Sequence, residues 1–282
     1  MNTIQLYLLL AALTGCLQPT TDRLNLLSDP IPGLVAFWDF QEPAGQDRVS
    51  KTGGYRLREQ GGSVERATEG VLGSYSARLT DGKHFLLPRA ELNKLNIHGK
   101  QAQVTVVAWV KRQNPKAWQA IAGVWDETRG KRQYCLFLNA TSRTHNQEMV
   151  RYPCRDLVHG HVSAIGRSTP GHCCCVTYSS GKTTIPLNTW QVITMTYDGA
   201  YSRVYVNGEL DAETNYNPFY YPDGIFDGGN DGAPFTVGAV SAHGKMNNFF
   251  DGLIGGLAVY NRALTPAEIR ILSQSGDAVI QK

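Results

Sequence analysis

Apolar and polar residues alternate with a period of two along most of this 282-residue chain. This spacing predicts β-strands, because successive side chains of a strand point to opposite faces of a sheet. The strands are expected at residues 34–40, 76–80, 84–88, 104–112, 120–125, 133–139, 161–166, 173–178, 190–198, 202–208, 235–240 and 253–260. Many short strands separated by turn residues predict an all-β fold, a two-sheet antiparallel β-sandwich of jelly-roll type.

Helical patterns are rare, and one or two short helices are expected. The clearer one starts at Thr265, where the sequence TPAE offers an N-cap, a proline at the first helical position and a glutamate three residues after the cap. A weaker helical pattern covers residues 89–96. The dipeptide Asn207-Gly208 predicts a two-residue hairpin turn, because both residues tolerate a positive φ.

The N-terminus predicts a lipid anchor. An apolar run over residues 6–13 has the length of a secretory signal core and is too short to span a bilayer. It is followed by Leu-Thr-Gly-Cys, which resembles the lipobox of bacterial lipoproteins and makes Cys16 the expected lipidation site. We therefore expect a signal peptide at 1–15, a lipidated tether at 16–32 and a folded domain at 33–282. If the lipobox is incidental, the protein is secreted instead.

These signals indicate the bacterial cell envelope, with the protein attached to the membrane only through its lipid and exposed at the outer membrane or the surface. The 27 basic and 24 acidic residues nearly balance, and the net charge is +3. No basic cluster with interleaved aromatic residues occurs, so nucleic acid is not an expected partner.

Several stretches occur in an order that resembles the laminin-G-like, concanavalin A-like lectin/glucanase superfamily. They lie at residues 33–40, 104–110, 190–199, 205–208, 235–238 and 250–264. The resemblance implies a concanavalin A-like jelly roll with one concave sheet, and ligands on the concave face or its rim. It implies a carbohydrate-binding, lectin-like domain that recognises a polysaccharide or glycoconjugate. The alternatives are a glycoside hydrolase or polysaccharide lyase using the same groove, and a protein-binding adhesion module.

The same resemblance raises the possibility of bound Ca²⁺. The closing motif of the family usually ends in isoleucine and aspartate, but Gly255 follows Ile254 in this chain. Other carboxylates could provide the oxygen ligands that Ca²⁺ requires. The candidates are Asp81, in an early Asp-Gly turn, and Asp227 and Asp231, in the glycine-rich loop 221–232. In the alternative interpretation these residues only make turns.

A second set of residues is the candidate ligand site. If three consecutive predicted strands are neighbours, their polar and aromatic side chains gather at one end of a sheet, where they could bind a sugar or perform acid–base chemistry. The candidate ligand-binding residues are Trp125, Asp126, Glu127, Arg132, Tyr134, His159 and His161. If the protein is an enzyme, the candidate catalytic residues are Glu127, His159, His161, Arg132 and Tyr134. The two histidines could also form part of a zinc site, and the simplest alternative is an ordinary polar face.

Three of the six cysteines are consecutive, in the sequence GHCCCVTY. In a strand, Cys173 and Cys175 face one way and Cys174 the other, so the three cannot form one compact metal cluster. We expect Cys174 to be buried. Cys154 lies in a loop-like stretch and is expected to form a disulfide with Cys173 or Cys175, which the oxidising space outside the cytoplasm would allow.

Overall fold

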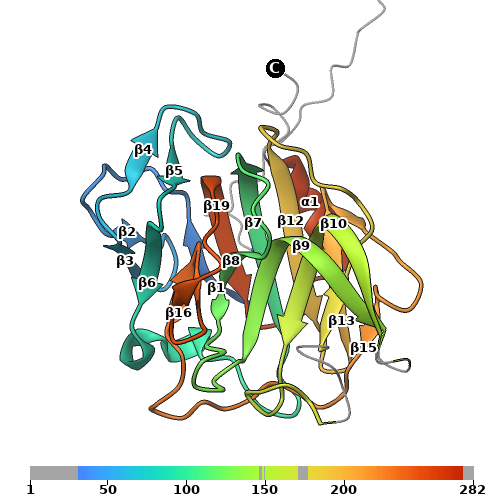
Figure 1. Ribbon diagram of the computed structural model, residues 1–282. Coiled ribbons are helices and arrows are strands. Elements are labelled where there is room, and N and C mark those ends of the chain that lie inside the picture. Colours follow the sequence, from blue (N-terminus) through green and yellow to red (C-terminus); the bar gives the residue numbers. More distant parts are fainter. Residues whose placement is uncertain (1–30, 146–147, 149, 171–176, 276–282) are drawn as a thin grey trace, which may run out of the picture.

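The computed structural model describes residues 31–145, 148, 150–170 and 177–275. They form two large antiparallel sheets and one small hairpin, as the sequence predicts (Figure 1). The first sheet has the strand order β14-β13-β12-β7-β19-β5-β4, with β1 paired to β19 and β15 paired to β13. Its strands are β14 (Glu209–Leu210), β13 (Tyr201–Val206), β12 (Gln191–Tyr197), β7 (Val104–Arg112), β19 (Gly252–Tyr260), β5 (Ser76–Leu79), β4 (Glu65–Ala67), β1 (Leu34–Trp38) and β15 (Phe219–Tyr220).

The second sheet has the order β11-β10-β9-β8-β16-β6-β3-β2. Its strands are β11 (Tyr178–Ser180), β10 (Val150–Val162), β9 (Tyr134–His145), β8 (Gln119–Val124), β16 (Phe235–Val237), β6 (His84–Leu87), β3 (Arg56–Gln60) and β2 (Arg48–Val49). In Figure 1 its long strands β9 and β10 cross in front of the first sheet, and β10 packs against β12 and β13. The hairpin of β17 (Val240–Ala242) and β18 (Lys245–Asn247) lies beside β8 and is joined to it by the backbone hydrogen bond from Ala120 to Asn248.

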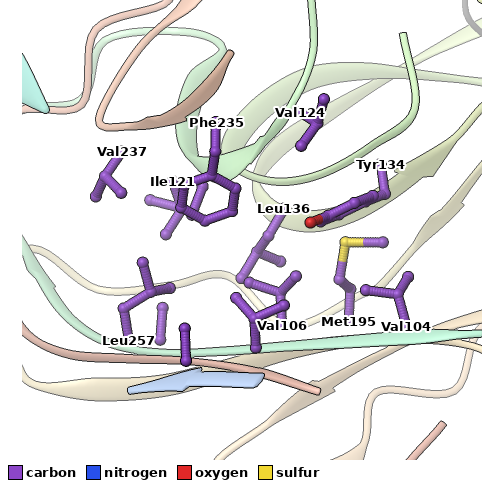
Figure 2. Packing of buried hydrophobic residues seen from close by; sticks show 14 of the residues in the cluster. Val104, Val106, Ile121, Val124, Tyr134, Leu136, Met195, Phe235, Val237 and Leu257 are labelled. Carbon is purple, nitrogen blue, oxygen red and sulfur yellow. The ribbon is translucent and has the colours of Figure 1, made fainter. Parts of the chain in front are cut away.

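The main hydrophobic core lies between the two sheets. Figure 2 shows it in close view, with Val104, Val106 and Met195 from the first sheet facing Tyr134, Leu136 and Phe235 from the second. A smaller cluster on the other face of the first sheet contains Trp109 and Trp190. The main core therefore buries the inner face of each sheet. The outer face of the second sheet remains available for other contacts.

The local signals for turns and helices are mostly confirmed. Helix α1 (Pro266–Gln274) begins with a complete capping box, in which Thr265 and Glu268 satisfy each other's backbone N–H groups. The pattern at 89–96 forms two short 3₁₀ helices, Arg89–Glu91 and Asn93–Leu95, rather than one α-helix. No helix within the described ranges has the length and apolar character needed to cross a membrane.

Several strand predictions differ from the structure in their bounds. The stretch 133–139 is longer than expected, since β9 runs from Tyr134 to His145, and Cys154, which was expected in a loop, lies in β10. The stretch 161–166 was expected to be a strand, but it contributes only His161 and Val162 to β10, which starts earlier, at Val150, and pairs there with the extended end of β9. The stretch 235–240 was expected to be one strand, but Gly238 has a φ of 84° and divides it into β16 and β17. A positive φ breaks the extended backbone, so the chain leaves the large sheet at this point.

Candidate functional site

The pairing of β9, β10 and β11 decides which side chains share the outer face of the second sheet. His159 is opposite Phe137 on β9, and His161 is opposite Cys135. On the other side His161 is opposite Tyr178 of β11. Directly paired residues point to the same face, so both histidines lie on the outer face with Phe137 and Tyr178. Their sequence neighbours Val158 and Val162 point into the main core.

His161 is enclosed by aromatic rings. Its ring centroid lies 4.6 Å from that of Phe137, 4.7 Å from that of Tyr178 and 5.5 Å from that of Trp125. Trp118 approaches it edge-on at 6.4 Å. Neither ring nitrogen of His161 has a hydrogen-bond partner among the described residues. A buried polar group without a partner is unusual, which makes His161 a candidate ligand-binding residue.

His159 lies beside His161, with ring centroids 5.7 Å apart. Its Nε2 is 2.9 Å from Ser180 Oγ, and its Nδ1 has no partner within the described part of the chain. Burial, together with the charge of Arg143, lowers the pKa of His159 to about 3. Burial also holds the pKa of His161 well below its ordinary value, and the neighbouring His159 and Arg132 add to this effect. Both imidazoles are therefore neutral near pH 7.

A pocket of about 380 Å³ opens above this aromatic face. Its base is formed by β9, β10 and β11, one wall by Trp118 before β8, and another by residues at the two ends of β18. The lining residues are Trp118, Glu127, Arg132, Phe137, Ser142, Thr144, Arg151, His161, Ser168, Tyr178, His243 and Asn248. The volume and the mixture of rings with a few polar groups are typical of small-ligand sites.

Trp118 has an unusual backbone for a bulky residue. Its φ of 55° lies in the left-handed region, and its N–H donates to the carbonyl oxygen of Asn139 at 2.9 Å. Its ring is half-buried and meets His159 edge-on, with centroids 5.5 Å apart. Backbone strain of this kind occurs often at binding sites, where the surrounding structure enforces it.

A polar network closes one end of the pocket. Glu127 Oε1 accepts a hydrogen bond from Trp125 Nε1 at 3.1 Å, and its Oε2 lies 3.6 Å from Arg132 Nη2. The Arg132 guanidinium also lies over the Trp125 ring, 5.6 Å from its centroid, and donates to Ser168 Oγ at 3.2 Å. The predicted residues Glu127, Arg132 and His161 therefore line one pocket, with Trp125 behind them.

Two predicted site residues lie elsewhere. Tyr134 was expected to share the site, but it points into the main core, where its hydroxyl donates to the Leu95 carbonyl oxygen at 2.7 Å (Figure 2). The reason is parity, because Tyr134 and His161 lie on opposite faces of the sheet. Asp126 is also absent from the pocket lining, since its carboxylate accepts from the backbone and side chain of Arg129 in the next turn.

Sequence reasoning missed several lining residues. Phe137 and Tyr178 follow from strand alternation once the pairing of His159 with Phe137 and of His161 with Tyr178 is known. Trp118 precedes the predicted strand by two residues and gives no periodic signal. His243 and Asn248 come from the region after Gly238, and nothing local in the sequence relates them to the histidines.

A sequence profile described as the concanavalin A-like lectin/glucanases superfamily matches residues 90–270 of the chain. The chain belongs to the concanavalin A-like lectin/glucanases superfamily. The matched region contains every residue of the pocket lining, as well as both histidines. A search of curated proteins finds no match.

Solved structures of this fold are similar to the chain at low sequence identity. Domain 4 of an extracellular arabinanase from Geobacillus stearothermophilus, in complex with arabinotriose, has a TM-score of 0.56 and 20% identity over 86% of this chain and 98% of its own. A Trypanosoma rangeli sialidase has 0.54 and 17%, over 88% of this chain and 33% of the sialidase. The receptor-binding domain of a botulinum neurotoxin C/D mosaic serotype has 0.50 and 13%, over 86% and 51%. At these identities the likeness shows the fold alone.

The residues expected to bind calcium in this superfamily domain do not converge. Asp227 lies 3.8 Å from Arg89, and Asp231 pairs with Arg129 at 2.7 Å, so both carboxylates already face cations. Asp81 forms the turn after β5. No group of three or more histidine, cysteine, aspartate or glutamate side chains suited to a metal occurs in the described ranges.

Gly255 explains part of this difference from the family motif. A Cβ atom at Gly255 would lie 2.5 Å from Val71 Cγ1 and 3.0 Å from the Trp190 ring. The position where the motif usually has aspartate is therefore filled by apolar packing, and a carboxylate does not fit there. The residues present do not suit Ca²⁺ at this point of the fold.

Two of the cysteines, Cys135 and Cys154, lie among the described residues. Cys173, Cys174 and Cys175 lie outside the described residues, so the pairing of Cys154 with Cys173 or Cys175 and the burial of Cys174 stay predictions. Cys154 lies on β10, with Sγ 3.5 Å from the carbonyl oxygen of Ala140. Cys135 is buried beside Trp125 and Phe137, where it acts as a small apolar residue.

Proposed function

We propose that the domain binds a carbohydrate, a polysaccharide or a glycoconjugate, in the pocket on the outer face of the second sheet. The observation that carries the proposal is His161, a buried neutral imidazole that lines the pocket among aromatic rings and whose two ring nitrogens have no partner among the described residues. The similar arabinanase domain was solved with arabinotriose, which supports a glycan as the kind of ligand this fold can bind.

The chemistry of the pocket suits a sugar. A sugar ring has apolar C–H faces, which stack on aromatic side chains, and hydroxyl groups around its edge that both donate and accept hydrogen bonds. Trp118, Phe137 and Tyr178 offer the rings. A neutral imidazole carries one donor and one acceptor nitrogen, so His161 can satisfy a hydroxyl in either role.

Binding without hydrolysis is the favoured activity. A glycosidase of the usual kind needs two carboxyl groups about 5–9.5 Å apart across the scissile bond. Among the described residues that line the pocket, Glu127 is the one carboxylate, and it already accepts from Trp125. The described lining of the pocket therefore has groups that can recognise a sugar, but one carboxylate where hydrolysis of the usual kind needs two.

A glycan array with the purified domain tests the proposal, followed by titration calorimetry on the sugars that bind. The variant Trp118→Ala should weaken binding about tenfold, because an aromatic ring that a sugar can stack on is removed from the pocket, whereas Tyr220→Ala, which removes an exposed aromatic ring outside the pocket, should leave binding unchanged. Assays for new reducing ends and for unsaturated uronates on the same sugars should show no product. Equal effects of the two variants would contradict the proposed site.

We also propose that the domain is held at the bacterial cell envelope by a lipid on Cys16. The support is the sequence Leu-Thr-Gly-Cys at the end of a short apolar run. Labelling cells with a clickable palmitate analogue should mark the wild-type protein and not the Cys16→Ser variant. A labelled Cys16→Ser variant, or an unlabelled wild type in the soluble fraction, would contradict the anchor.

A further inference from the structure

A second pocket continues the first one past Arg132. It has a volume of about 340 Å³ and shares Glu127, Arg132 and Ser168 with the first pocket. Its remaining lining residues are Thr128, Arg129, Gly130 and Arg167. We call the two pockets together the outer-face groove. Because they share three lining residues, the two pockets adjoin, and a chain-like ligand that extends past Arg132 would contact both.

The charges in the groove are strongly unequal. Its lining contains four arginines, Arg129, Arg132, Arg151 and Arg167, against the single carboxylate of Glu127. The charge of Arg129 is met by Asp126 and Asp231, each at 2.7 Å. The positive charge that acts on a ligand in the second pocket therefore comes from Arg132 and Arg167.

Arg132 lines both pockets, and Arg167 lines the second one. The Arg132 side chain is 12% exposed, its contact with Glu127 is long at 3.6 Å, and its Nε has no partner among the described residues. Arg167 is exposed and lies across Gly130, and its side chain forms no ion pair within the described part of the chain. A guanidinium group with unused donors is well matched to a carboxylate, which it can bind through two parallel hydrogen bonds.

We infer that the outer-face groove selects an acidic glycan, with one sugar against the aromatic rings around His161 and the carboxylate of an adjoining uronic acid between Arg132 and Arg167. This inference rests on the proposed carbohydrate binding and adds the class of sugar to it. The neutral state of His161 fits this arrangement, because a protonated imidazole would compete with the arginines for the carboxylate. The groove thus separates ring recognition from charge recognition.

The test uses tetrasaccharides of mannuronate, galacturonate and hyaluronan together with their carboxyl-reduced forms, which keep the sugar stereochemistry and lose the charge. Calorimetry should show that at least one acidic tetrasaccharide binds about tenfold or more tightly than its reduced form, because each charged hydrogen bond adds strongly to affinity. Raising the salt concentration should weaken only the acidic ligand.

Arg167→Ala should remove most of this preference without weakening the reduced ligand. The matched control is Arg155→Ala, which removes another exposed arginine on β10 outside both pockets. Equal binding of the acidic and reduced forms, or equal effects of the two variants, would overturn the inference while leaving carbohydrate binding intact. If neither form of any tetrasaccharide binds and the glycan array also shows no binding, both the proposed carbohydrate binding and the inference of an acidic glycan fail.

Discussion

Replacing His161 with phenylalanine should stabilise the fold while it removes ligand binding. The imidazole is 4% exposed and its two ring nitrogens have no described partner. An unsatisfied buried polar group costs about 1–3 kcal/mol. A phenyl ring has nearly the same shape, and it would pack against Phe137 and Tyr178, whose centroids lie 4.6 and 4.7 Å from the present ring. We expect a gain of about 1 kcal/mol or more in unfolding free energy at pH 7.5.

The gain should grow in acid. The folded state lowers the pKa of His161, so the unfolded chain takes up a proton more readily as the pH falls. The unfolding free energy of the wild type is therefore unaffected by this histidine above about pH 6.5. Below that pH it falls, with a slope that approaches 1.4 kcal/mol per pH unit. The phenylalanine variant lacks this loss.

Urea unfolding followed by tryptophan fluorescence at pH 7.5 and pH 5 measures both effects, and calorimetry with a bound glycan measures the loss of affinity. A His161→Phe variant that is less stable than the wild type at pH 7.5 by more than about 1 kcal/mol would refute the reasoning. It would mean that the ring nitrogens are satisfied in the free protein.

Three further changes test other parts of the account. Tyr134→Phe should lower the unfolding free energy by about 1 kcal/mol, because it removes the bond to Leu95, and should leave glycan affinity unchanged; a loss of affinity would return Tyr134 to the site. Thr265→Ala should lower stability by about 1 kcal/mol through the lost cap of α1, and no change in urea unfolding would contradict this. Gly255→Asp should destabilise by about 3 kcal/mol or more and create no Ca²⁺ affinity in calorimetry, because the carboxylate would meet Trp190; a stable, calcium-binding variant would disprove the packing argument.

The architecture was predictable because each strand carries its own signal. The stretch 104–112 reads as alternating or continuous apolar residues bounded by polar ones, and β7 has the same bounds. The cap at Thr265 and the turn at Asn207 are chemical signals that act within a few residues, and the structure confirms both. Local information of this kind is sufficient for elements and for the fold class.

The site could be predicted only in part, because alternation does not say which face is inside. Tyr134 and His161 both have the right spacing, but their pairing across β9 and β10 places one in the core and the other outside. The register of β10 against β9 also shifts between Pro153 and Leu157 and between Leu157 and Val158, in a stretch whose proline and charges hide the strand. Glu127, Arg132 and His161 were nevertheless found, since each lies near the end of a strong strand pattern.

The remaining lining residues depend on contacts that are distant in the sequence. Trp118 acquires its place from a strained backbone and a hydrogen bond to Asn139, neither of which leaves a periodic signal. Asn248 reaches the pocket because its carbonyl oxygen pairs with Ala120, more than a hundred residues earlier. Such contacts follow from the assembled sandwich and from nothing in the local sequence.

The most direct test of the central claim is a crystal structure of the domain with the sugar that binds most tightly on the array. We predict that the sugar lies in the outer-face pocket, with one ring stacked on Trp118 and a hydroxyl within hydrogen-bonding distance of a ring nitrogen of His161. A sugar bound only elsewhere, for example on the exposed pair of Tyr201 and Tyr220, would contradict the account.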